Sequence, residues 1–205
     1  MKNKLLIIGA SGHGKVVADI ALKMNKWHKM AFLDDDESIE SAMGIKVIGK
    51  SSDAFTYIND YDIFTAIGNN EIREKFQSRL ETAGASIPVL IHPDAVLGEQ
   101  VGLKTGTVVM PGVVINCCTR IGKGCIINTG ATIDHDSVIE DYVHISPGAH
   151  LAGTVRIGKG SWIGVGSMVS NDIFIVSGCM VGAGAVVVRD ITEVGTYVGV
   201  PARMA

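Results

Sequence analysis

Three histidines in the second half of the chain, His135, His144 and His150, are the side chains best suited to proton transfer near neutral pH. His135 is followed directly by Asp136, whose carboxylate could polarise the imidazole ring. Such a pair can act as a general base. It also occurs as a solvated surface pair, and the two residues alone favour that alternative.

A glycine-rich segment near the N-terminus suggests phosphate binding. Gly9, Gly12 and Gly14 stand between an apolar run at 4–8 and a helical pattern at 15–24. A strand, a glycine loop and a helix start, in this order, present backbone N–H groups to a phosphate. The spacing G-x-x-G-x-G differs from the dinucleotide pattern G-x-G-x-x-G, which disfavours a nicotinamide cofactor.

Acidic residues follow the glycine loop after about 20 positions. A second apolar strand at 31–33 ends in Asp34 and Asp35, whose carboxylates can accept hydrogen bonds from ribose hydroxyls or a base edge. A third strand at 63–67 runs into Gly68 and a helical segment. Together these features predict a nucleotide-binding α/β unit. The alternative is that the glycine loop is only a tight turn.

The three histidines lie within an internal six-residue repeat, and this repeat indicates which structural element positions them. Every sixth residue from Leu97 to Val187 is Leu, Ile or Val, at sixteen consecutive positions. A six-residue step would spread these side chains around an α-helix, but it suits a short strand followed by a turn. Three such units close a triangular coil of about 18 residues, with the aliphatic side chains stacked inward and successive coils about 4.8 Å apart.

Glycine often follows the aliphatic residue of a unit. We expect these glycines at the corners of the coil, where they relieve backbone strain at positive φ. The glycines concerned are Gly98, Gly122, Gly158, Gly164 and Gly182.

The coil relates the candidate residues to one another. Gly153 follows His135 by one full coil, so it should lie at the same phase about 4.8 Å away. Its N–H could face a carbonyl beside the base, or Gly153 could be only a corner residue. His144 follows His135 by half a coil, so these two should lie on different sides of the prism. A site that uses both histidines would then need two chains.

Composition argues against several classes of protein. The net charge is −3 and no run of Lys or Arg is present, which argues against a nucleic-acid partner. No apolar stretch approaches the roughly 20 residues that span a bilayer. The cysteines form no C-x-x-C pair, so neither a metal site nor a disulfide framework is expected. We therefore expect a cytoplasmic protein that does not span a membrane.

The six-residue units resemble those of the hexapeptide-repeat acyltransferases, whose fold is the left-handed parallel β-helix. The handedness rests on this resemblance alone. A Rossmann-like α/β domain, 1–88, before such a helix, 89–205, is similar to the acetyltransferases of bacterial sugar pathways. These include UDP-4-amino-sugar N-acetyltransferases and sialic acid O-acetyltransferase-like relatives. The resemblance covers essentially the whole chain and rests on GASGHG at 9–14, FLDDD at 32–36, IINTGATIDHDSVI at 126–139, YVHISPGAHLAGTV at 142–155 and YVGVPAR at 197–203.

The resemblance implies a catalytic set. His135 would be the general base and Asp136 would polarise it, although relatives often carry Glu, one methylene longer, at that place. Asn128 and His144 would belong to the same active site, and Gly153 would face the thioester. Family members are trimers with active sites between neighbouring β-helices, so a homotrimer is expected.

The resemblance also implies two sets of binding residues. The nucleotide sugar would be held by Gly9, Ser11, Gly12, His13, Gly14, Asp34, Asp35 and Gly68. The cosubstrate acetyl-CoA would contact His144, Gly153, Gly182, Ala183, Pro201 and Arg203. No metal is implied.

The expected activity is acetyl-CoA-dependent N-acetylation of a UDP-4-amino-4,6-dideoxy sugar, by direct attack and without a covalent enzyme intermediate. One alternative is O-acetylation of a sugar of the sialic acid type by the same machinery. Another is a non-catalytic trimer that binds a nucleotide sugar.

Overall fold

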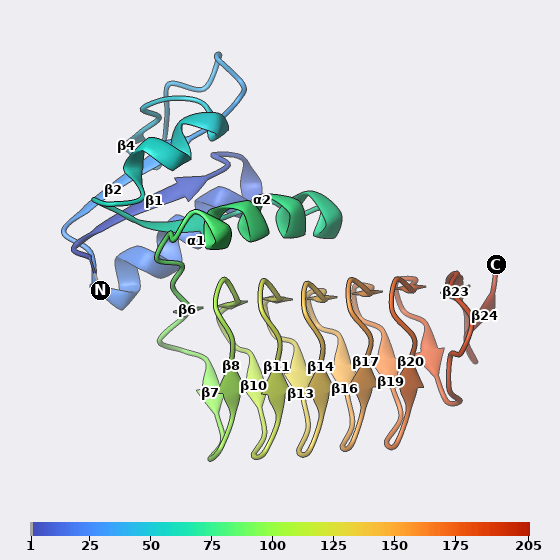
Figure 1. The fold of residues 1–205 in the computed structure, drawn as a ribbon. Coiled ribbons are helices and arrows are strands. Elements are labelled where there is room, and N and C mark those ends of the chain that lie inside the picture. Colours follow the sequence, from blue (N-terminus) through green and yellow to red (C-terminus); the bar gives the residue numbers. More distant parts are fainter. Residues whose placement is uncertain (1) are drawn as a thin grey trace. The chain divides into compact units, whose positions relative to one another are not determined.

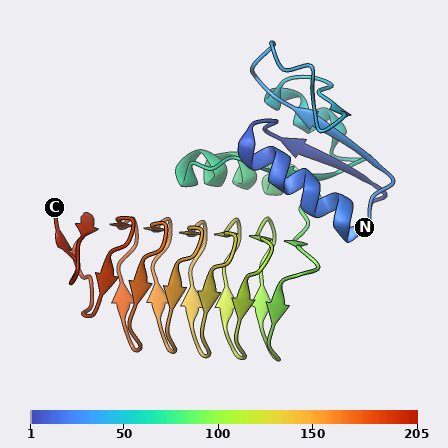
Figure 2. The ribbon, with the colours of Figure 1, turned by 180° about the vertical axis from the view of Figure 1, so that it is seen from behind.

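The computed structural model describes residues 2–205, which form two compact units, one ending at Pro93 and one spanning Asp94–Ala205 (Figures 1 and 2). The sequence placed this boundary at residue 88. It lies further along because β6 (Leu90–Ile91) contacts α1 (Gly12–Met24). The Ile91 N–H, for example, lies 3.4 Å from Met24 Sδ.

A three-stranded parallel sheet forms the middle of the N-terminal unit, in the order β2 (Lys29–Leu33), β1 (Lys4–Ile8), β5 (Asp62–Thr65). The last four residues of β1 are all buried, as expected for a central strand covered on both faces. Since the strands are parallel, the loops that leave them meet at one edge of the sheet. These loops are the glycine segment, the acidic segment and the segment that contains Gly68.

Helices and short elements complete this unit. Helix α1 ends at Asn25, whose left-handed backbone (φ 51°) lets its N–H donate to Leu22 O. The second helix, α2, is capped by Asn69, whose side-chain oxygen accepts from the Ile72 N–H at 3.0 Å. The remaining elements are β3 (Ser41–Ala42), β4 (Ile45–Lys46), the 3₁₀ helix η1 (Ser51–Tyr57) and α2 (Asn70–Thr82).

Two glycines of the segment 9–14, at the end of β1 and the start of α1, are required by close backbone contacts. A Cβ on Gly14 would overlap the carbonyl oxygen of Gly9. Gly9 itself has φ +100°, and a Cβ there would lie 2.9 Å from Ala66 O. Helix α1 begins at Gly12, earlier than the helical pattern at 15–24 indicated. The end of the glycine loop therefore forms the first turn of α1, whose N–H groups have no partner inside the helix.

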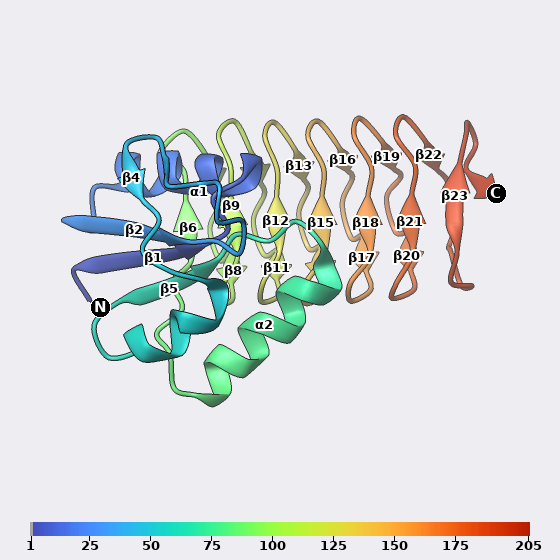
Figure 3. The same ribbon diagram turned by 90° about the horizontal axis from the view of Figure 1, so that it is seen from above.

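The C-terminal unit is a parallel β-helix of short strands in three sheets, in which strands one coil apart pair in parallel; only the last pairing among the described residues, β23 with β24, is antiparallel. The first sheet holds β7 (Val96–Leu97), β10 (Val114–Ile115), β13 (Thr132–Ile133), β16 (His150–Leu151), β19 (Met168–Val169) and β22 (Val186–Val187). The second holds β8 (Gly102–Leu103), β11 (Arg120–Ile121), β14 (Val138–Ile139), β17 (Arg156–Ile157) and β20 (Phe174–Ile175). The third, seen in Figure 3, includes β9 (Val108–Val109), β12 (Ile126–Ile127), β15 (His144–Ile145), β18 (Trp162–Ile163), β21 (Met180–Val181), β23 (Thr196–Val198) and β24 (Arg203–Met204).

The aliphatic repeat forms the core of the β-helix, as predicted. None of the sixteen positions is exposed; Leu97 and Leu103 in the first coil are half-buried and the other fourteen are buried. The residue two places earlier in each unit is also small or β-branched and buried in most units. The register predicted from the six-residue period is therefore confirmed.

The expected reason for the glycines after the aliphatic residues is wrong. Positive φ occurs three residues after the aliphatic, at glycines such as Gly130 and Gly148, and not at Gly98, Gly122, Gly158, Gly164 or Gly182. Those five are needed because a Cβ would strike the neighbouring coil or the C-terminal segment. On Gly98, for example, it would lie 2.6 Å from Cys117 N. Their role is close approach of backbones rather than relief of strain.

Candidate active site

His135 lies at a turn between the first and second sheets, which we call the His135 edge. Successive coils place Cys117, His135, Gly153 and Asn171 at the same position of this edge. His135 Nδ1 lies 2.8 Å from Asp136 Oδ2, and 52% of the histidine side chain is exposed. Because Nδ1 faces a carboxylate it carries the proton, so Nε2 of the neutral ring is the proton acceptor.

Gly153 lies directly against the His135 ring. A Cβ on Gly153 would come within 2.8 Å of both Cε1 and Nε2 of His135, so only glycine leaves room for the ring as it is placed. The Gly153 carbonyl accepts from Asp172 N–H, while within residues 2–205 its own N–H donates to no protein group. The edge thus combines a proton acceptor with a neighbouring free N–H donor, which are the two groups that acyl transfer requires.

The charge around His135 suits a base that is strengthened by its surroundings. The pKa of His135 is raised above 6.5, first by the hydrogen bond to Asp136 and further by the charges of Asp134, Asp136 and Asp172, while desolvation acts in the opposite direction. Asp134 is itself held in place, because its Oδ1 accepts from Asn116 Nδ2 at 2.7 Å and from the His135 N–H at 2.9 Å.

His144 and Asn128 form a second cluster on the third sheet. Asn128 Oδ1 accepts from the Thr129 N–H at 2.8 Å, so its amide NH₂ group is the one that faces His144 Nε2 at 3.2 Å. The lone pair of Nε2 is thereby engaged. The His144 ring also packs on Trp162, with ring centroids 4.6 Å apart. His144 is therefore held in a fixed orientation, while His135 keeps an available acceptor nitrogen.

The two clusters do not meet within one chain. His135 belongs to the edge between the first and second sheets, whereas His144 projects from β15 in the third sheet. The half-coil separation in sequence predicts this placement. His150, on β16, is engaged by Thr132, with His150 Nδ1 2.9 Å from Thr132 Oγ1.

His13 is the distinctive residue of the glycine loop. Burial, together with the nearby charge of Arg73, lowers the pKa of His13 to about 4, so the ring is neutral at physiological pH. Its Nε2 is enclosed and has no hydrogen-bond partner within residues 2–205. Arg73 also holds the loop after β5, because its Nη1 donates to Ile67 O and to Gly68 O at 2.9 and 3.0 Å.

Asp34 and Asp35 both hold backbone at the edge of the sheet. Asp34 Oδ2 accepts from the Ala10 N–H at 2.6 Å, which ties the acidic loop to the glycine loop. Asp35 accepts from the backbone and the hydroxyl of Ser51. A carboxylate has about four acceptor positions, so these bonds leave capacity for a ligand. Ser11 stands before α1 as its exposed N-cap residue.

The C-terminal segment folds back on the last coil and brings Gly182 close to β23. Gly182 N–H donates to Tyr197 O at 2.8 Å, and a Cβ on Gly182 would lie 2.8 Å from Val198 Cγ1. Ala183 is exposed next to it, and Pro201 is exposed in the turn between β23 and β24. Gly182 and Ala183 follow a strand of the third sheet, so they lie on a different edge from Gly153.

Arg203 shares a pocket with Arg189, a candidate residue that the sequence analysis did not identify. A pocket of about 230 Å³ is lined by Arg203, Arg189, Tyr197 and their neighbours. Arg189 follows β22 at the position that corresponds to His135 and Gly153, so this pocket lies at the C-terminal end of the His135 edge. Arg189 stands a whole number of coils after His135, and this spacing could have identified it. It was overlooked because the aliphatic pattern ends at Val187, before Arg189 is reached.

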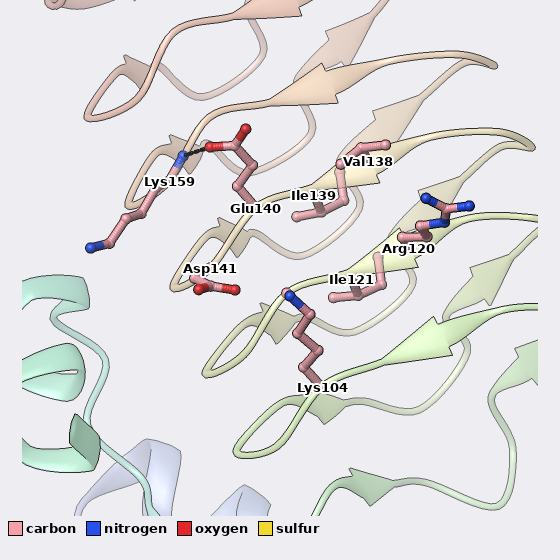
Figure 4. Close-up of a pocket in the computed structure, with 9 residues that line it drawn as sticks. Lys104, Arg120, Ile121, Val138, Ile139, Glu140, Asp141 and Lys159 are labelled. Atoms are coloured by element: carbon pink, nitrogen blue, oxygen red, sulfur yellow. Dashed lines mark hydrogen bonds between the residues drawn. The ribbon is translucent and has the colours of Figure 1, made fainter. Parts of the chain in front are cut away.

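A larger groove, about 320 Å³, lies on the second sheet (Figure 4). It lies over β11 and β14 and is bordered by residues that follow β8 and β17. Its lining residues are Lys104, Arg120, Ile121, Gly122, Val138, Ile139, Glu140, Asp141 and Lys159. In Figure 4 Arg120 points to the side opposite Lys104 and Asp141. None of the sequence-predicted site residues lines this groove.

Two family models match the chain. The PglD N-terminal domain matches residues 4–80. The bacterial transferase hexapeptide (six repeats) matches residues 118–153, a segment that contains His135 and Gly153.

Solved structures extend the similarity to both units together. The acetyltransferase domain of PglB from Neisseria gonorrhoeae FA1090 is 40% identical, with a TM-score of 0.96 over 100% of both chains, and is also solved in complex with acetyl coenzyme A. PerB from Caulobacter crescentus, in complex with CoA and GDP-perosamine, is 36% identical, with a TM-score of 0.93 over 98% of this chain and 97% of that chain. The chain belongs to the hexapeptide-repeat sugar N-acetyltransferases.

A further member of this family is the UDP-N-acetylbacillosamine N-acetyltransferase of Bacillus subtilis (strain 168). It is 38% identical over 115 residues, which are 54% of this chain and 52% of that protein. As a sugar N-acetyltransferase family member the protein is an acyltransferase. The predicted fold, a Rossmann-like α/β domain followed by a left-handed parallel β-helix, is confirmed.

Two kinds of feature are absent from residues 2–205. No helix there is long and apolar enough to cross a membrane. No group of three or more His, Cys, Asp or Glu side chains there is arranged to hold a metal ion.

Proposed function

We propose that the protein transfers the acetyl group of acetyl-CoA to the 4-amino group of a UDP-4-amino-4,6-dideoxy sugar. The observation that carries this proposal is the pairing of His135 Nε2 with the free N–H of Gly153 on one edge of the β-helix. Two relatives support the substrate classes: the PglB domain is solved with acetyl coenzyme A, and PerB with CoA and GDP-perosamine. The B. subtilis relative is named for a UDP sugar and PerB is solved with a GDP sugar, so the choice of UDP is the part of this proposal that the acceptor panel below tests.

The chemistry needs a base and an oxyanion donor on the same side of the β-helix. His135 Nε2 accepts the proton that the amine loses as its nitrogen attacks the acetyl carbonyl carbon. The Gly153 N–H donates to the carbonyl oxygen as that oxygen gains negative charge. The C–S bond then breaks, the sulfur takes up the proton that His135 had accepted, and CoA leaves as its thiol. Asp136 stabilises the imidazolium form of His135 during this transfer.

The remaining candidate residues divide between binding the two substrates. We assign the nucleotide to the glycine loop and the acidic strand end, through Gly9, Ser11, Gly12, His13, Gly14, Asp34, Asp35 and Gly68. We assign CoA to Gly153 and to Gly182, Ala183, Pro201 and Arg203, and we add Arg189 to this set. Much of the rate would then come from holding the amine against the thioester.

We infer that the protein assembles as a homotrimer. His135 and His144 lie on different sides of one β-helix, and the CoA residues Gly153 and Ala183 lie on different edges. A cleft between two copies unites His135 of one copy with Asn128 and His144 of the next. Closed cyclic assembly makes every such cleft equivalent.

The test is a thiol-release assay with acetyl-CoA and a panel of UDP- and GDP-linked sugars that carry an amine or a hydroxyl at C4. A UDP-4-amino sugar is expected to be the best acceptor. His135→Ala should lower kcat/KM roughly 10²-fold or more while leaving acetyl-CoA affinity nearly unchanged. His150→Ala serves as the control, because the His150 ring is engaged by Thr132 and has no role in the proposed transfer.

Each other result would assign a different function, or a different catalytic base, to this protein. A hydroxyl sugar that outperforms every amine would make it an O-acetyltransferase. No thiol release, together with no binding of acetyl-CoA in calorimetry, would indicate a non-catalytic nucleotide-sugar-binding trimer. If His135→Ala kept more than about a tenth of the activity, the base would be another residue, with His144 the next to examine.

A further inference from the structure

One backbone N–H of the unit that contains Gly153 lies outside the hydrogen-bond ladder that joins the coils. The Ala152 N–H donates to Val169 O on the following coil, and the Thr154 N–H donates to His135 O on the preceding one. The Gly153 N–H between them donates to no group within residues 2–205. Gly153 stands two residues after an inward aliphatic residue, and we call the N–H at this place of a unit the turn amide. Such a donor needs a side chain, a water molecule or a ligand as its partner.

At six turns of the described chain the turn amide is satisfied or removed. Proline, which has no N–H, occupies the position at Pro111 and Pro147. At four other turns a side-chain oxygen accepts from the turn amide at 2.8–3.0 Å, and these pairs are Asp141 with Lys123, Asn128 with Thr129, Asp134 with His135 and Glu140 with Lys159. In the pairs formed by Asn128 and Asp134, the acceptor belongs to the residue directly before the amide. An Asn or Asp side chain at that place can therefore turn back and occupy the turn amide.

The turn amide of Gly153 is left open in a buried position. Gly153 is buried, and unpaired N–H groups at buried positions are rare in folded proteins. The turn amides of Cys117 and Asn171, on the same edge, also have no partner within residues 2–205. Gly153 is the one that lies against the His135 ring, since a Cβ on it would come within 2.8 Å of Nε2. The open donor therefore stands beside the nitrogen that accepts the proton in the proposed reaction.

Asp134 and Ala152 occupy equivalent positions on successive coils. Each directly follows the inward residue of a first-sheet strand, and these two strands are paired. Asp134 Oδ1 lies 2.9 Å from the His135 N–H, which withdraws that turn amide from any ligand. Ala152 has no side-chain acceptor, so the turn amide of Gly153 stays open. The two coils thus differ in their available donors because of a single side chain.

We propose that Ala152 is a positioning residue for acetyl transfer. Because its side chain carries no acceptor, the Gly153 N–H remains free for the carbonyl oxygen of the thioester. Asp134 has the complementary role on the preceding coil, since it prevents the amide of the base from binding that oxygen. The two residues together decide which amide beside the His135 ring receives the acetyl carbonyl. The inference rests on the proposed function, because it presumes that the thioester binds at Gly153.

The experiment places an acceptor at position 152 and compares it with a side chain of similar shape that has none. The variants are Ala152→Asp, Ala152→Asn and Ala152→Leu. The first two put an oxygen one residue before the turn amide, as Asp134 and Asn128 do, whereas the third is the matched control. We expect all three to fold, because other coils hold polar or larger side chains at this repeat position, namely Asn116, Asp134, Ser170 and Val188.

Ala152→Asp and Ala152→Asn should each lower kcat roughly 10²-fold or more, the usual effect of losing one oxyanion donor. KM for acetyl-CoA and for the acceptor should change little, because the carbonyl oxygen gains its charge only in the transition state. Ala152→Leu should keep most of its kcat. A crystal structure of Ala152→Asn should show the introduced amide oxygen within hydrogen-bonding distance of the Gly153 N–H.

Four results would overturn the inference. An equal loss of kcat in Ala152→Leu would assign the effect to bulk, and a loss in Ala152→Asp without one in Ala152→Asn would assign it to charge. An introduced oxygen that points away from the Gly153 N–H would show that position 152 does not control this amide. Wild-type kcat with the N–H capped would show that the reaction does not use it. In each case a wild type with normal turnover leaves the proposed function standing, whereas a wild type that releases no thiol with any nucleotide amino sugar removes both.

Discussion

Asp136 and Gly153 constrain the two sides of the His135 ring. Asp136 engages Nδ1, so the proton of the neutral ring lies away from the reacting side. Gly153 leaves room for Nε2 and Cε1, which a larger residue would displace. Each constraint acts on a different part of the proposed base, so each can be tested with a single substitution.

The first residue-scale prediction concerns pH. His135 must be neutral to accept a proton, and its pKa is raised above 6.5, first by the hydrogen bond to Asp136. kcat/KM should therefore be fully developed above this raised pKa and should fall as pH drops through it. Asp136→Asn removes the charge that favours the protonated ring, so the pKa of His135 falls and the acidic limb moves to lower pH.

The measurement is the kcat/KM profile of wild type and Asp136→Asn from about pH 5 to pH 9 with the same acceptor. The acceptor amine titrates equally in both profiles, so the difference between them reports the enzyme group. The plateau at high pH should also be lower in the variant, because the ring loses the carboxylate that orients it. An acidic limb that does not move would show that Asp136 does not control the protonation of His135.

The second residue-scale prediction is that Gly153→Ala inactivates the enzyme without unfolding it. The new Cβ would lie 2.8 Å from two ring atoms of His135, so the ring must turn away from its position. A displaced base is expected to cost roughly 10²-fold in kcat. Gly153 does not have positive φ, so alanine is compatible with its backbone.

Gly102→Ala is the matched control. Gly102 also lies in the β-helix without positive φ, and a Cβ there meets no atom within 4 Å. Thermal melts should show both variants folded, and only Gly153→Ala should lose activity. Wild-type turnover by Gly153→Ala would mean that the ring position seen here is not the catalytic one.

At the scale of elements, the position at which α1 begins depends on a close contact between the backbones of Gly9 and Gly14. Gly14 lies in the first turn of α1 and packs on the carbonyl of Gly9, the residue that directly follows β1. The phosphate-binding geometry proposed for this loop therefore needs the helix to begin close to the strand. The third glycine, Gly12, faces open space and makes no such contact.

Gly14→Ala should destabilise the N-terminal unit, because its Cβ would overlap Gly9 O and force the helix away from the strand. Overpacking of this kind typically costs about 1–3 kcal/mol. Gly12→Ala should be nearly neutral or slightly stabilising, since alanine is the better helix former. Thermal denaturation of both variants measures the difference, and equal melting temperatures would contradict the argument.

At the scale of the whole molecule, one chain holds the proposed catalytic residues in two separate places. The stacking of coils keeps His135 on one edge and His144 on the opposite sheet, whatever the side chains do. A complete site then requires a second copy, so activity and assembly should be linked.

We predict that mixed trimers restore activity. His135→Ala and His144→Ala variants should each be inactive or strongly impaired alone, and sedimentation should show both as trimers. After unfolding and refolding together, some clefts combine an intact His135 from one copy with an intact His144 from the next. A mixture with no more activity than its components would place both residues of one site in the same chain, and a stable monomer at micromolar concentration would remove the shared cleft altogether.

The six-residue period was sufficient to predict the β-helix, the inward aliphatic ladder and the adjacency of His135 and Gly153. In a coil with a constant number of residues per turn, separation along the sequence converts directly into position in space. The split between His135 and His144 follows from the same rule. The glycine loop and the acidic strand end likewise follow from short local patterns.

Contacts between side chains on different coils or loops could not be obtained from the period. Arg120 and Arg156 occupy equivalent repeat positions, yet only Arg156 meets a carboxylate, because Glu140 lies beside it on the neighbouring coil. His13 looks like an ordinary loop histidine until burial and the charge of Arg73, distant in sequence, lower its pKa to about 4. Ionisation and pairing depend on which side chains the packing brings together, and a backbone repeat does not encode that information.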